Sequence, residues 1–258
     1  MQHVRAKKHR GQHFLKNEFI AERIVSALPI TNDYDTILEV GPGMGVLTKY
    51  LINISKKKLI AVDIDAESIF YLQNKFPELN IIEGDILKLN LSVITPGKIA
   101  VIGNFPYNIS SQILFKVLEN KEKVPLVVGM FQKEVAQRIA SGPGNKEYGI
   151  LSVLMQTFYD VEYLFSVDAQ EFTPAPKIQS GVLFFRIKEY NLPFKEKLLF
   201  NVVKTAFNQR RKTLRNALKP LNVNLSGTES EKFLDKRAEQ LSHEDFVVLT
   251  GNIQAIKK

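Results

Sequence analysis

The sequence predicts a doubly wound α/β domain followed by a small all-helical domain. Apolar segments of strand type alternate with helical segments up to about residue 187. These strand segments are continuous apolar runs, as expected for a parallel sheet with helices on both faces. Beyond residue 193 the pattern becomes helical. A chain of 258 residues is long enough for one large domain and one small domain.

Five apolar segments are predicted as strands of the parallel sheet, and helices are predicted between them. The strand candidates are Thr36–Val40, Lys58–Asp65, Leu79–Asp85, Lys98–Asn104 and Pro125–Phe131. The helix candidates are Val46–Ile54, Ala66–Phe76, Ser110–Asn120 and Lys133–Ala140.

After Gly149 the chain is predicted to add one buried helix over 150–160 and two strands. The strands are Tyr163–Asp168 and Gly181–Lys188, on either side of a proline-containing loop at 172–180. A linker over 188–193 then divides the chain, which gives domains at 1–188 and 189–258.

The second domain is predicted to be helical throughout. Over 207–221, one helix face carries apolar side chains and the arginines fall off that face. The apolar residues are Phe207, Leu214, Ala217, Leu218 and Leu221, and the arginines are Arg210, Arg211 and Arg215. The segment 242–245 has the composition of a helix N-terminus, with a serine cap followed by acids.

Basic residues are concentrated in two segments that contain no acid, 1–17 and 197–228. The formal net charge is +8, a balance that favours a polyanionic partner. Either segment alone could be a solvated face. Two such segments in one chain are more typical of phosphate-binding surfaces, and Arg210 and Arg211 are the candidate phosphate contacts.

Composition also excludes several classes of protein. The chain contains no cysteine, which excludes disulfides, cysteine-ligated zinc and thiol catalysis. No apolar run is long enough to span a membrane, and the basic N-terminus lacks the apolar core of a secretory signal. We expect a cytoplasmic protein with no membrane partner and no metal site.

A glycine loop, EVGPGMG at 39–45, closes the first predicted strand and opens a helix. Its pattern is neither the dinucleotide fingerprint nor a P-loop. Asp63 ends the second strand 22 residues after Gly41, where an acid can accept ribose hydroxyls, and Asp85 ends the third. A tight turn and two helix caps are the alternative interpretation, but three successive strand ends of this kind favour a nucleoside site.

Glu39 distinguishes between possible nucleoside cofactors. A carboxylate beside the glycine loop suits a ligand with an ammonium group and disfavours a pyrophosphate. This favours S-adenosylmethionine over NAD.

The fourth strand ends in NFPYNIS at 104–110, which has the form Asn-x-Pro-Tyr. The exocyclic amine of adenine is a poor nucleophile because its lone pair is delocalised into the ring. The Asn104 side-chain oxygen and the Pro106 carbonyl could accept its two hydrogens, and Tyr107 could stack on the base. Rate enhancement would come from positioning and electrostatics. The alternative is a plain strand-ending turn.

Together these motifs resemble those of class I S-adenosylmethionine-dependent methyltransferases with a Rossmann-like sheet that act on amino groups. Four further segments resemble the rRNA adenine N6,N6-dimethyltransferase family, and above all its housekeeping bacterial small-subunit branch. They are QHFLKN (12–17), FTPAPKIQS (172–180), FNQRRKTLRNAL (207–218) and RAEQLSHEDF (237–246). The resemblance covers nearly the whole chain.

The resemblance implies a set of site residues. The cofactor-binding residues would be His13, Leu15, Gly41, Gly43, Asp63, Asp85 and Asn104. The catalytic residues would be Asn104, Pro106, Tyr107 and Phe172, with Phe172 clamping the target adenine opposite Tyr107. Three positions depart from the family pattern: His13 stands for a more usual Asn, Phe105 for Leu and Asp63 for a common Glu.

The resemblance further implies dimethylation of two adjacent adenines in 16S rRNA of the small ribosomal subunit, late in its assembly. We expect a monomer, with the N-terminal arm and the helical domain holding RNA phosphates. Three alternatives are a large-subunit rRNA dimethyltransferase of the macrolide-resistance type, a non-catalytic assembly or nucleic-acid-binding factor, and a DNA adenine methyltransferase. The intact NFPY motif disfavours the second, and Asn104 in place of an acid disfavours the third.

Overall fold

The computed structural model describes residues 4, 6–7, 11–54, 57–223 and 225–256, with side chains described as far as residue 253 in the last helix. The chain divides into two compact units. The sheet unit comprises Met1–Ala136 and Val161–Ile187, and the helical unit comprises Gln137–Asp160 and Lys188–Lys258.

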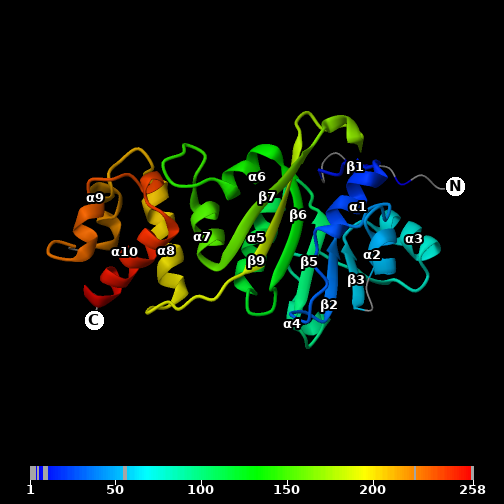
Figure 1. Ribbon diagram of the computed structural model, residues 1–258, viewed down its shortest axis with the longest axis horizontal. Helices are drawn as coiled ribbons and strands as arrows, with labels where there is room; N and C mark the ends of the chain where they lie inside the picture. Colours follow the sequence, from blue (N-terminus) through cyan, green and yellow to red (C-terminus); the bar gives the residue numbers. More distant parts are fainter. Residues whose placement is uncertain (1–3, 5, 8–10, 55–56, 224, 257–258) are drawn as a thin grey trace. The chain divides into compact units, whose positions relative to one another are not determined.

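The sheet unit is built on a seven-stranded sheet with the order β4-β3-β2-β5-β6-β9-β7 (Figure 1). Strands β4, β3, β2, β5 and β6 pair in parallel, and β9 joins β6 antiparallel. The strands are β2 (Thr36–Val40), β3 (Lys58–Asp63), β4 (Asn80–Glu83), β5 (Ile99–Asn104), β6 (Leu126–Gln132), β7 (Tyr159–Val167) and β9 (Ser180–Ile187).

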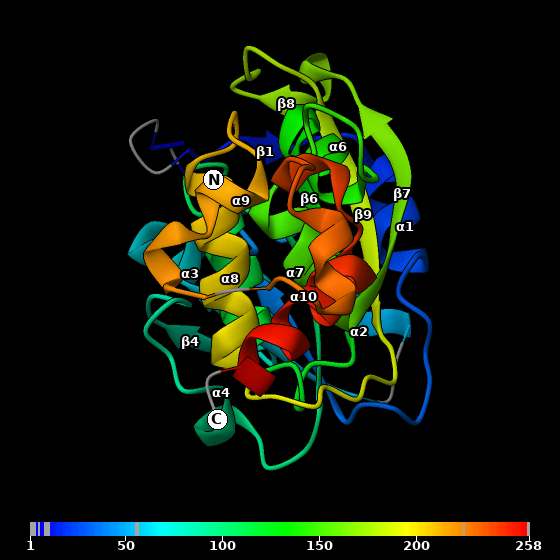
Figure 2. The ribbon, with the colours of Figure 1, turned by 90° about the vertical axis from the view of Figure 1, so that its left-hand side faces the viewer.

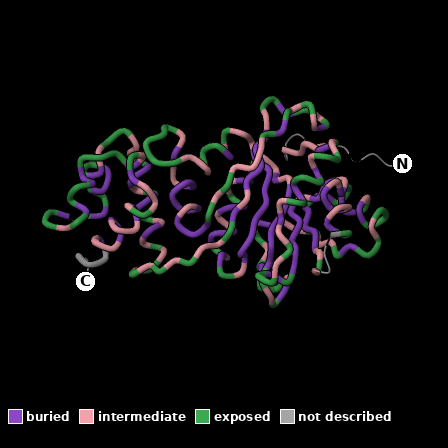
Figure 3. The backbone as a smooth tube through the Cα atoms, in the orientation of Figure 1, coloured by how far each residue is buried: buried purple, intermediate pink, exposed green. Residues whose placement is uncertain are grey.

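All five predicted strands are therefore present and lie in one sheet. The central strands are buried along nearly their whole length, which explains their continuous apolar sequences (Figure 3). The prediction of a parallel sheet is confirmed for these five, while β9 adds an antiparallel strand. Strand β9 lies within one residue of its predicted bounds, whereas β7 begins four residues earlier than predicted and ends one residue earlier.

Six helices accompany the sheet: α1 (Glu18–Ser26), α2 (Thr48–Ile54), α3 (Ala66–Lys75), α4 (Leu91–Ile94), α5 (Ser110–Glu119) and α6 (Lys133–Ala140), of which α6 runs on into the helical unit. Helix α3 begins after Asp65, whose side chain accepts a hydrogen bond from the Glu67 amide at 3.4 Å. One core cluster joins α1 to the sheet through buried side chains such as Ile24, Ile37 and Val128.

Strand order places a ligand crevice at one edge of this sheet. The chain proceeds outward from β2 through β3 to β4, and then returns to β5 on the other side of β2. Ligands of open α/β sheets bind at the carboxyl ends of the strands, where the order reverses in this way. The glycine loop, Asp63 and Asn104 all lie at these strand ends.

A second, two-stranded sheet was not predicted from the sequence. Strand β1 (Phe14–Leu15) pairs antiparallel with β8 (Phe172–Thr173), and Figure 2 shows the two side by side. Next to this pairing the Lys16 amide donates to the Glu171 carbonyl at 2.9 Å, and the Asn17 amide group donates to the Glu171 carboxylate at 2.8 Å. The N-terminal arm is thereby attached to the loop that begins at residue 172.

The helical unit contains α7 (Ile150–Phe158), α8 (Glu196–Asn208), α9 (Leu214–Ala217) and α10 (His243–Ile256). Helices α7, α8 and α10 pack against one another. Short 3-10 turns fill the segment between α9 and α10, at Lys219–Leu221, Glu229–Phe233 and Ala238–Gln240. No helix in the described part of the chain is both long enough and apolar enough to cross a membrane.

Two features of this unit differ from the sequence predictions. The predicted boundary between 188 and 189 gave α7 to the first domain, whereas its contacts group 137–160 with the C-terminal helices, because α7 packs on α8 and α10. The predicted helix over 207–219 is interrupted: α8 ends at Asn208 and α9 begins at Leu214. The Leu214 amide instead donates to the Lys236 carbonyl at 2.8 Å, which turns the chain there.

Candidate active site

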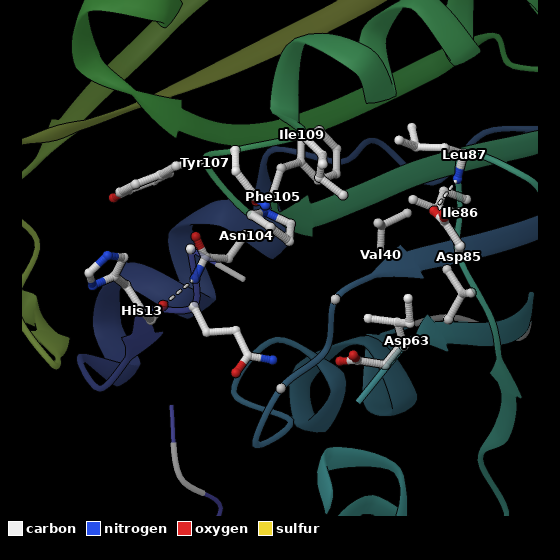
Figure 4. Close-up of a pocket in the computed structure, with 18 of the residues that line it drawn as sticks. His13, Val40, Asp63, Asp85, Ile86, Leu87, Asn104, Phe105, Tyr107 and Ile109 are labelled. Atoms are coloured by element: carbon white, nitrogen blue, oxygen red, sulfur yellow. Dashed lines mark hydrogen bonds between the residues drawn. The ribbon is translucent and has the colours of Figure 1, made fainter. Parts of the chain in front are cut away.

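One pocket at the carboxyl edge of the sheet brings together most of the predicted site residues (Figure 4). Its lining comes from 11–14, 62–64, 84–87 and 104–109, with Val40, Gly41 and Gly43. Asp63 and Asp85 lie at one end of the view in Figure 4, and Asn104, Tyr107 and His13 lie toward the other. The glycine loop and the NFPY motif therefore share one cavity.

The glycine loop adopts a backbone conformation that side chains rarely permit. Gly41, Gly43 and Gly45 have φ angles of 68°, 56° and 76°. A Cβ atom on Gly43 would also lie 2.9 Å from the Phe14 ring of the N-terminal arm. The backbone of the loop can thus approach both the arm and a ligand closely.

Asp63 ends β3 as a buried carboxylate that lines the pocket. Its Oδ1 accepts a hydrogen bond from the Asp65 amide at 2.9 Å. Burial raises the pKa of Asp63, and hydrogen bonds from the backbone amides of Asp65 and Gly43 oppose that rise. The bond from the Gly43 amide ties the acid to the glycine loop.

Asp85 follows β4 in a turn of its own. Its Oδ1 accepts from the Leu87 amide at 3.0 Å, and its Oδ2 lies 4.0 Å from the Lys88 ammonium. Ile64, which directly follows Asp63, exposes 54% of its surface and lines the same pocket. A pocket lined by an apolar side chain and two carboxylates is suited to the flat face and polar edges of a nucleoside.

Asn104, at the end of β5, has a fixed side-chain orientation. Its Nδ2 donates to the main-chain carbonyl of His13 at 2.9 Å. Because a carbonyl can only accept, this bond requires the NH₂ group on that side and turns Oδ1 away from His13. The Pro106 carbonyl accepts from the Ile109 amide at 3.1 Å and retains a second lone pair. Both acceptors expected from the motif are therefore available.

Tyr107 is held at its hydroxyl and at its ring. The hydroxyl oxygen lies 2.5 Å from Ser180 Oγ, and burial raises the pKa of this phenol. The ring stacks on the His13 imidazole, with centroids 5.3 Å apart and an interplanar angle of 30°. His13 Nδ1 also lies 2.7 Å from the Pro174 carbonyl, so in this contact the nitrogen is the donor.

Comparison with known proteins identifies the family. Residues 3–253 match the family model described as ribosomal RNA adenine dimethylase. The chain belongs to that family. It is 56% identical to "Ribosomal RNA small subunit methyltransferase A" of Cytophaga hutchinsonii, covering 97% of this chain and 98% of the relative. It is 55% identical to the protein of the same name from Flavobacterium johnsoniae, covering 99% and 98%.

A solved structure gives the same result for the fold. A dimethyladenosine transferase from Plasmodium falciparum superposes with a TM-score of 0.80 at 27% identity, covering 95% of this chain and 99% of that one. Membership of the rRNA adenine dimethylase family confirms the predicted class I methyltransferase fold, the enzyme class and S-adenosylmethionine as methyl donor. Ribosomal RNA is the partner of this family.

Phe172 is not at the place expected for a clamp in a dimethylase. Its side chain is 2% exposed, belongs to the hydrophobic core cluster and does not line the pocket. Its neighbour across the ladder is Leu15 of β1, which is likewise buried in the core and absent from the lining. The aromatic ring that faces Tyr107 is that of His13.

Glu39 also differs from the prediction of an ammonium partner. It is 1% exposed within β2, is not part of the pocket lining and accepts a hydrogen bond from the Thr48 hydroxyl at 2.6 Å. Burial raises the pKa of Glu39 to about 7, although the Thr48 bond lowers it. The carboxyl group therefore ties β2 to α2 on either side of the glycine loop.

The two predicted RNA contacts in the helical unit differ from each other. Arg210 Nε donates to the Glu239 carboxylate at 2.7 Å, and its Nη2 donates to the Lys146 carbonyl. Arg211 is exposed and forms no ion pair with any residue that the structure describes. Acids distant in sequence therefore neutralise part of the basic segment, as Asp235 does for Arg215 at 3.0 Å.

The lining residues that were not predicted as site residues include Phe14, Ile64, Leu87 and Ile109. Ile64 could have been found, because it is an apolar residue directly after a strand-end acid. Ile109 follows the NFPY motif and faces the same cavity. The other two depend on the arm and the turn after β4, whose positions no local pattern encodes.

The residues that are present fit S-adenosylmethionine. Two carboxylates and Ile64 suit its nucleoside, and the backbone of Gly41 and Gly43 lines the same cavity without side chains. The NFPY motif lies at the other part of the same cavity, where the methyl group must meet its acceptor.

Proposed function

We propose that this enzyme transfers methyl groups from S-adenosylmethionine to N6 of two adjacent adenines in 16S rRNA during late assembly of the small ribosomal subunit. The single observation that carries the chemistry is the Asn104 amide, which the His13 carbonyl orients with Oδ1 free to accept. The printed names of the close relatives support the small subunit as its substrate.

The bound cofactor supplies an electrophilic methyl group. Asp63 and Asp85 would hold its ribose and adenine, and the backbone of Gly41 and Gly43 would lie against the remainder. Asn104 would also border the cofactor. These assignments are supported by the position of each residue in the lining of one pocket.

The protein's own contribution to the reaction is to position the target amine. Asn104 Oδ1 and the Pro106 carbonyl accept the two N6 hydrogens, which frees the nitrogen lone pair for in-line attack. Because the ammonium that develops on methylation is acidic, no strong general base is required. The rate enhancement comes from orientation and preorganised dipoles. Orientation can lower the barrier by roughly 7–11 kcal/mol in well-oriented reactions.

Tyr107 would stack on the flipped adenine. Its ring is already fixed by the Ser180 hydroxyl and by the His13 imidazole, so the stacking surface is preorganised. Phe172 belongs to the core cluster, and its role as a clamp opposite Tyr107 stays a prediction.

We further propose that the protein acts as a monomer and that the N-terminal arm and the helical unit hold rRNA phosphates. Exposed basic residues such as Arg211 and the net charge of +8 support this part of the proposal.

A methyl-transfer assay tests the function. The protein is incubated with methyl-labelled S-adenosylmethionine and small subunits that lack these methyl groups, with large-subunit RNA in parallel. We expect label in the small subunit and loss of transfer in Asn104→Ala. The matched control is Asn53→Ala, an exposed asparagine whose side chain bonds a helix carbonyl. Label in large-subunit RNA alone would contradict the proposal.

A further inference from the structure

The N-terminal arm converges on one buried acid outside the catalytic motif. Asp65 is fully buried, and its carboxylate accepts hydrogen bonds from Lys7 Nζ and, at 3.3 Å, from Gln12 Nε2. Lys7 Nζ also lies 3.2 Å from Glu67, and the Lys7 amide donates to Gln12 Oε1 at 2.8 Å. The arm is thus attached to the segment between β3 and α3.

A buried carboxylate is costly unless it is paired and hydrogen-bonded. Burial alone would raise the pKa of Asp65, but the bonds from Lys7 and Gln12 hold it below its ordinary value. Because the carboxylate is charged and enclosed, it needs such partners, and among the described residues of the arm Lys7 and Gln12 bind it. The attachment is specific to these side chains.

This attachment lies one residue from the catalytic amide contact. Gln12 directly precedes His13, whose main-chain carbonyl accepts from Asn104 Nδ2. On the other side, Phe14 pairs with Thr173 in the β1–β8 ladder. The His13 carbonyl is therefore held between two anchors, the Asp65 contacts and the ladder.

We propose that Asp65 is a positioning residue for methyl transfer: by binding Lys7 and Gln12, it holds the His13 carbonyl where that carbonyl orients the Asn104 amide. This inference rests on the proposed function and assigns no contact between Asp65 and either substrate. On this proposal the arm helps to orient the catalytic amide in addition to covering the pocket.

Two other roles of the arm make different predictions. If the arm only covers the cofactor, loosening it raises the KM for S-adenosylmethionine and leaves kcat unchanged at saturation. If Lys7 only attracts RNA, removing its charge weakens RNA binding, whereas removing the charge of Asp65 strengthens it. The positioning role predicts that variants of Lys7 and variants of Asp65 both lower kcat, although the two native side chains carry opposite charges.

The kinetic test uses Lys7→Met, Gln12→Ala and Asp65→Asn, each assayed with both substrates saturating. Asparagine is an equally good helix N-cap, so Asp65→Asn keeps the start of α3. We expect each variant to lower kcat by about tenfold, less than the roughly 100-fold that a gross misplacement can cost. Lys7→Arg keeps the ion pair, so this variant should retain most of the wild-type kcat. The control is Lys49→Met, which removes a surface ion pair to Glu18.

A second readout needs no substrate and no activity. The side-chain NH₂ of Asn104 is assigned by the loss of its NMR signals in Asn104→Asp, and its hydrogen exchange is measured in the free protein. We expect faster exchange in Lys7→Met and Gln12→Ala than in the wild type or Lys49→Met. Unchanged exchange, or an unchanged kcat at saturation in an enzyme that methylates rRNA, would overturn the inference. An inactive wild type with the expected exchange would contradict the proposed function alone.

Discussion

At the residue scale, the decisive group is an amide whose two ends are distinguished by one hydrogen bond. Asn104 donates to the His13 carbonyl, so the end that faces away from it is an acceptor. The sequence predicted the acceptor but not what orients it, because residues 13 and 104 are separated by most of the sheet unit. A short motif can encode a functional group, whereas its orientation depends on a tertiary contact.

Gly43→Ala should weaken cofactor binding. The φ angle of 56° disfavours alanine, and the new Cβ atom would lie 2.9 Å from the Phe14 ring. We expect about a tenfold rise in the dissociation constant for S-adenosylmethionine, measured by calorimetry, from a strain on the order of 1–2 kcal/mol. Gly142→Ala is the control, because a Cβ atom there meets nothing within 4 Å. Equal affinities in both variants would contradict the proposed role of the loop.

Glu39 should make folding stability depend on pH. Its pKa rises from 4.5 to about 7 on folding because of burial, so between these values the folded state holds a proton that the unfolded state releases. The free energy of unfolding therefore falls as pH rises through this window and levels off above it, by about 3 kcal/mol in total.

Glu39→Gln should remove this part of the pH dependence, because glutamine can still accept from Thr48 but does not titrate. Urea unfolding at pH 5, 6, 7 and 8 measures the effect against Glu78→Gln, an exposed position. If the wild type and Glu39→Gln lose stability in parallel, the carboxyl group is not the source.

At the scale of elements, the parallel strands were predictable because each one is a buried apolar run. Strands β1 and β8 were not, since each has two residues and exists because of its partner. The helix predicted over 207–219 was wrong at its centre: the apolar face is real, but the backbone between Asn208 and Leu214 bonds elsewhere. Periodicity indicates which residues are buried more reliably than where a helix ends.

Phe172 in strand β8 allows a structural role to be tested against the predicted role of adenine clamp. Because its side chain is buried in the core cluster, Phe172→Ala should lower the free energy of unfolding by about 3–5 kcal/mol. Thermal unfolding is the measurement, and Ile178→Ala, a partly exposed position in the same loop, is the control. An unchanged melting temperature with loss of methyl transfer would instead support the original prediction of an adenine clamp.

At the scale of the whole molecule, the sequence predicted only in part which charged side chains are unpaired. The segment 197–228 contains no acid, yet Asp235 and Glu239 pair with two of its arginines. Lys7 in the arm likewise binds Asp65 and Glu67. Runs of one charge therefore overestimate the surface that is free for RNA. Arg211 forms no ion pair with a described residue, so its charge remains available to RNA.

Arg211→Gln should reduce the salt dependence of RNA binding. Losing one phosphate contact lowers the slope of log affinity against log salt concentration by about 0.7–0.9. Arg215→Gln is the matched control, because Arg215 is already paired with Asp235 and should change the slope less. Filter binding of 16S rRNA from low to moderate salt gives both slopes, and equal slopes would argue against Arg211 as a contact.

The most direct test of the whole account is mass spectrometry of 16S rRNA fragments after reaction with the purified enzyme and small subunits that lack the modification. The account predicts one fragment with two neighbouring N6,N6-dimethyladenosines in the wild-type reaction and none in the Asn104→Ala reaction. Monomethyladenosine as the end product, or dimethyladenosine formed at the wild-type rate by Asn104→Ala, would contradict it.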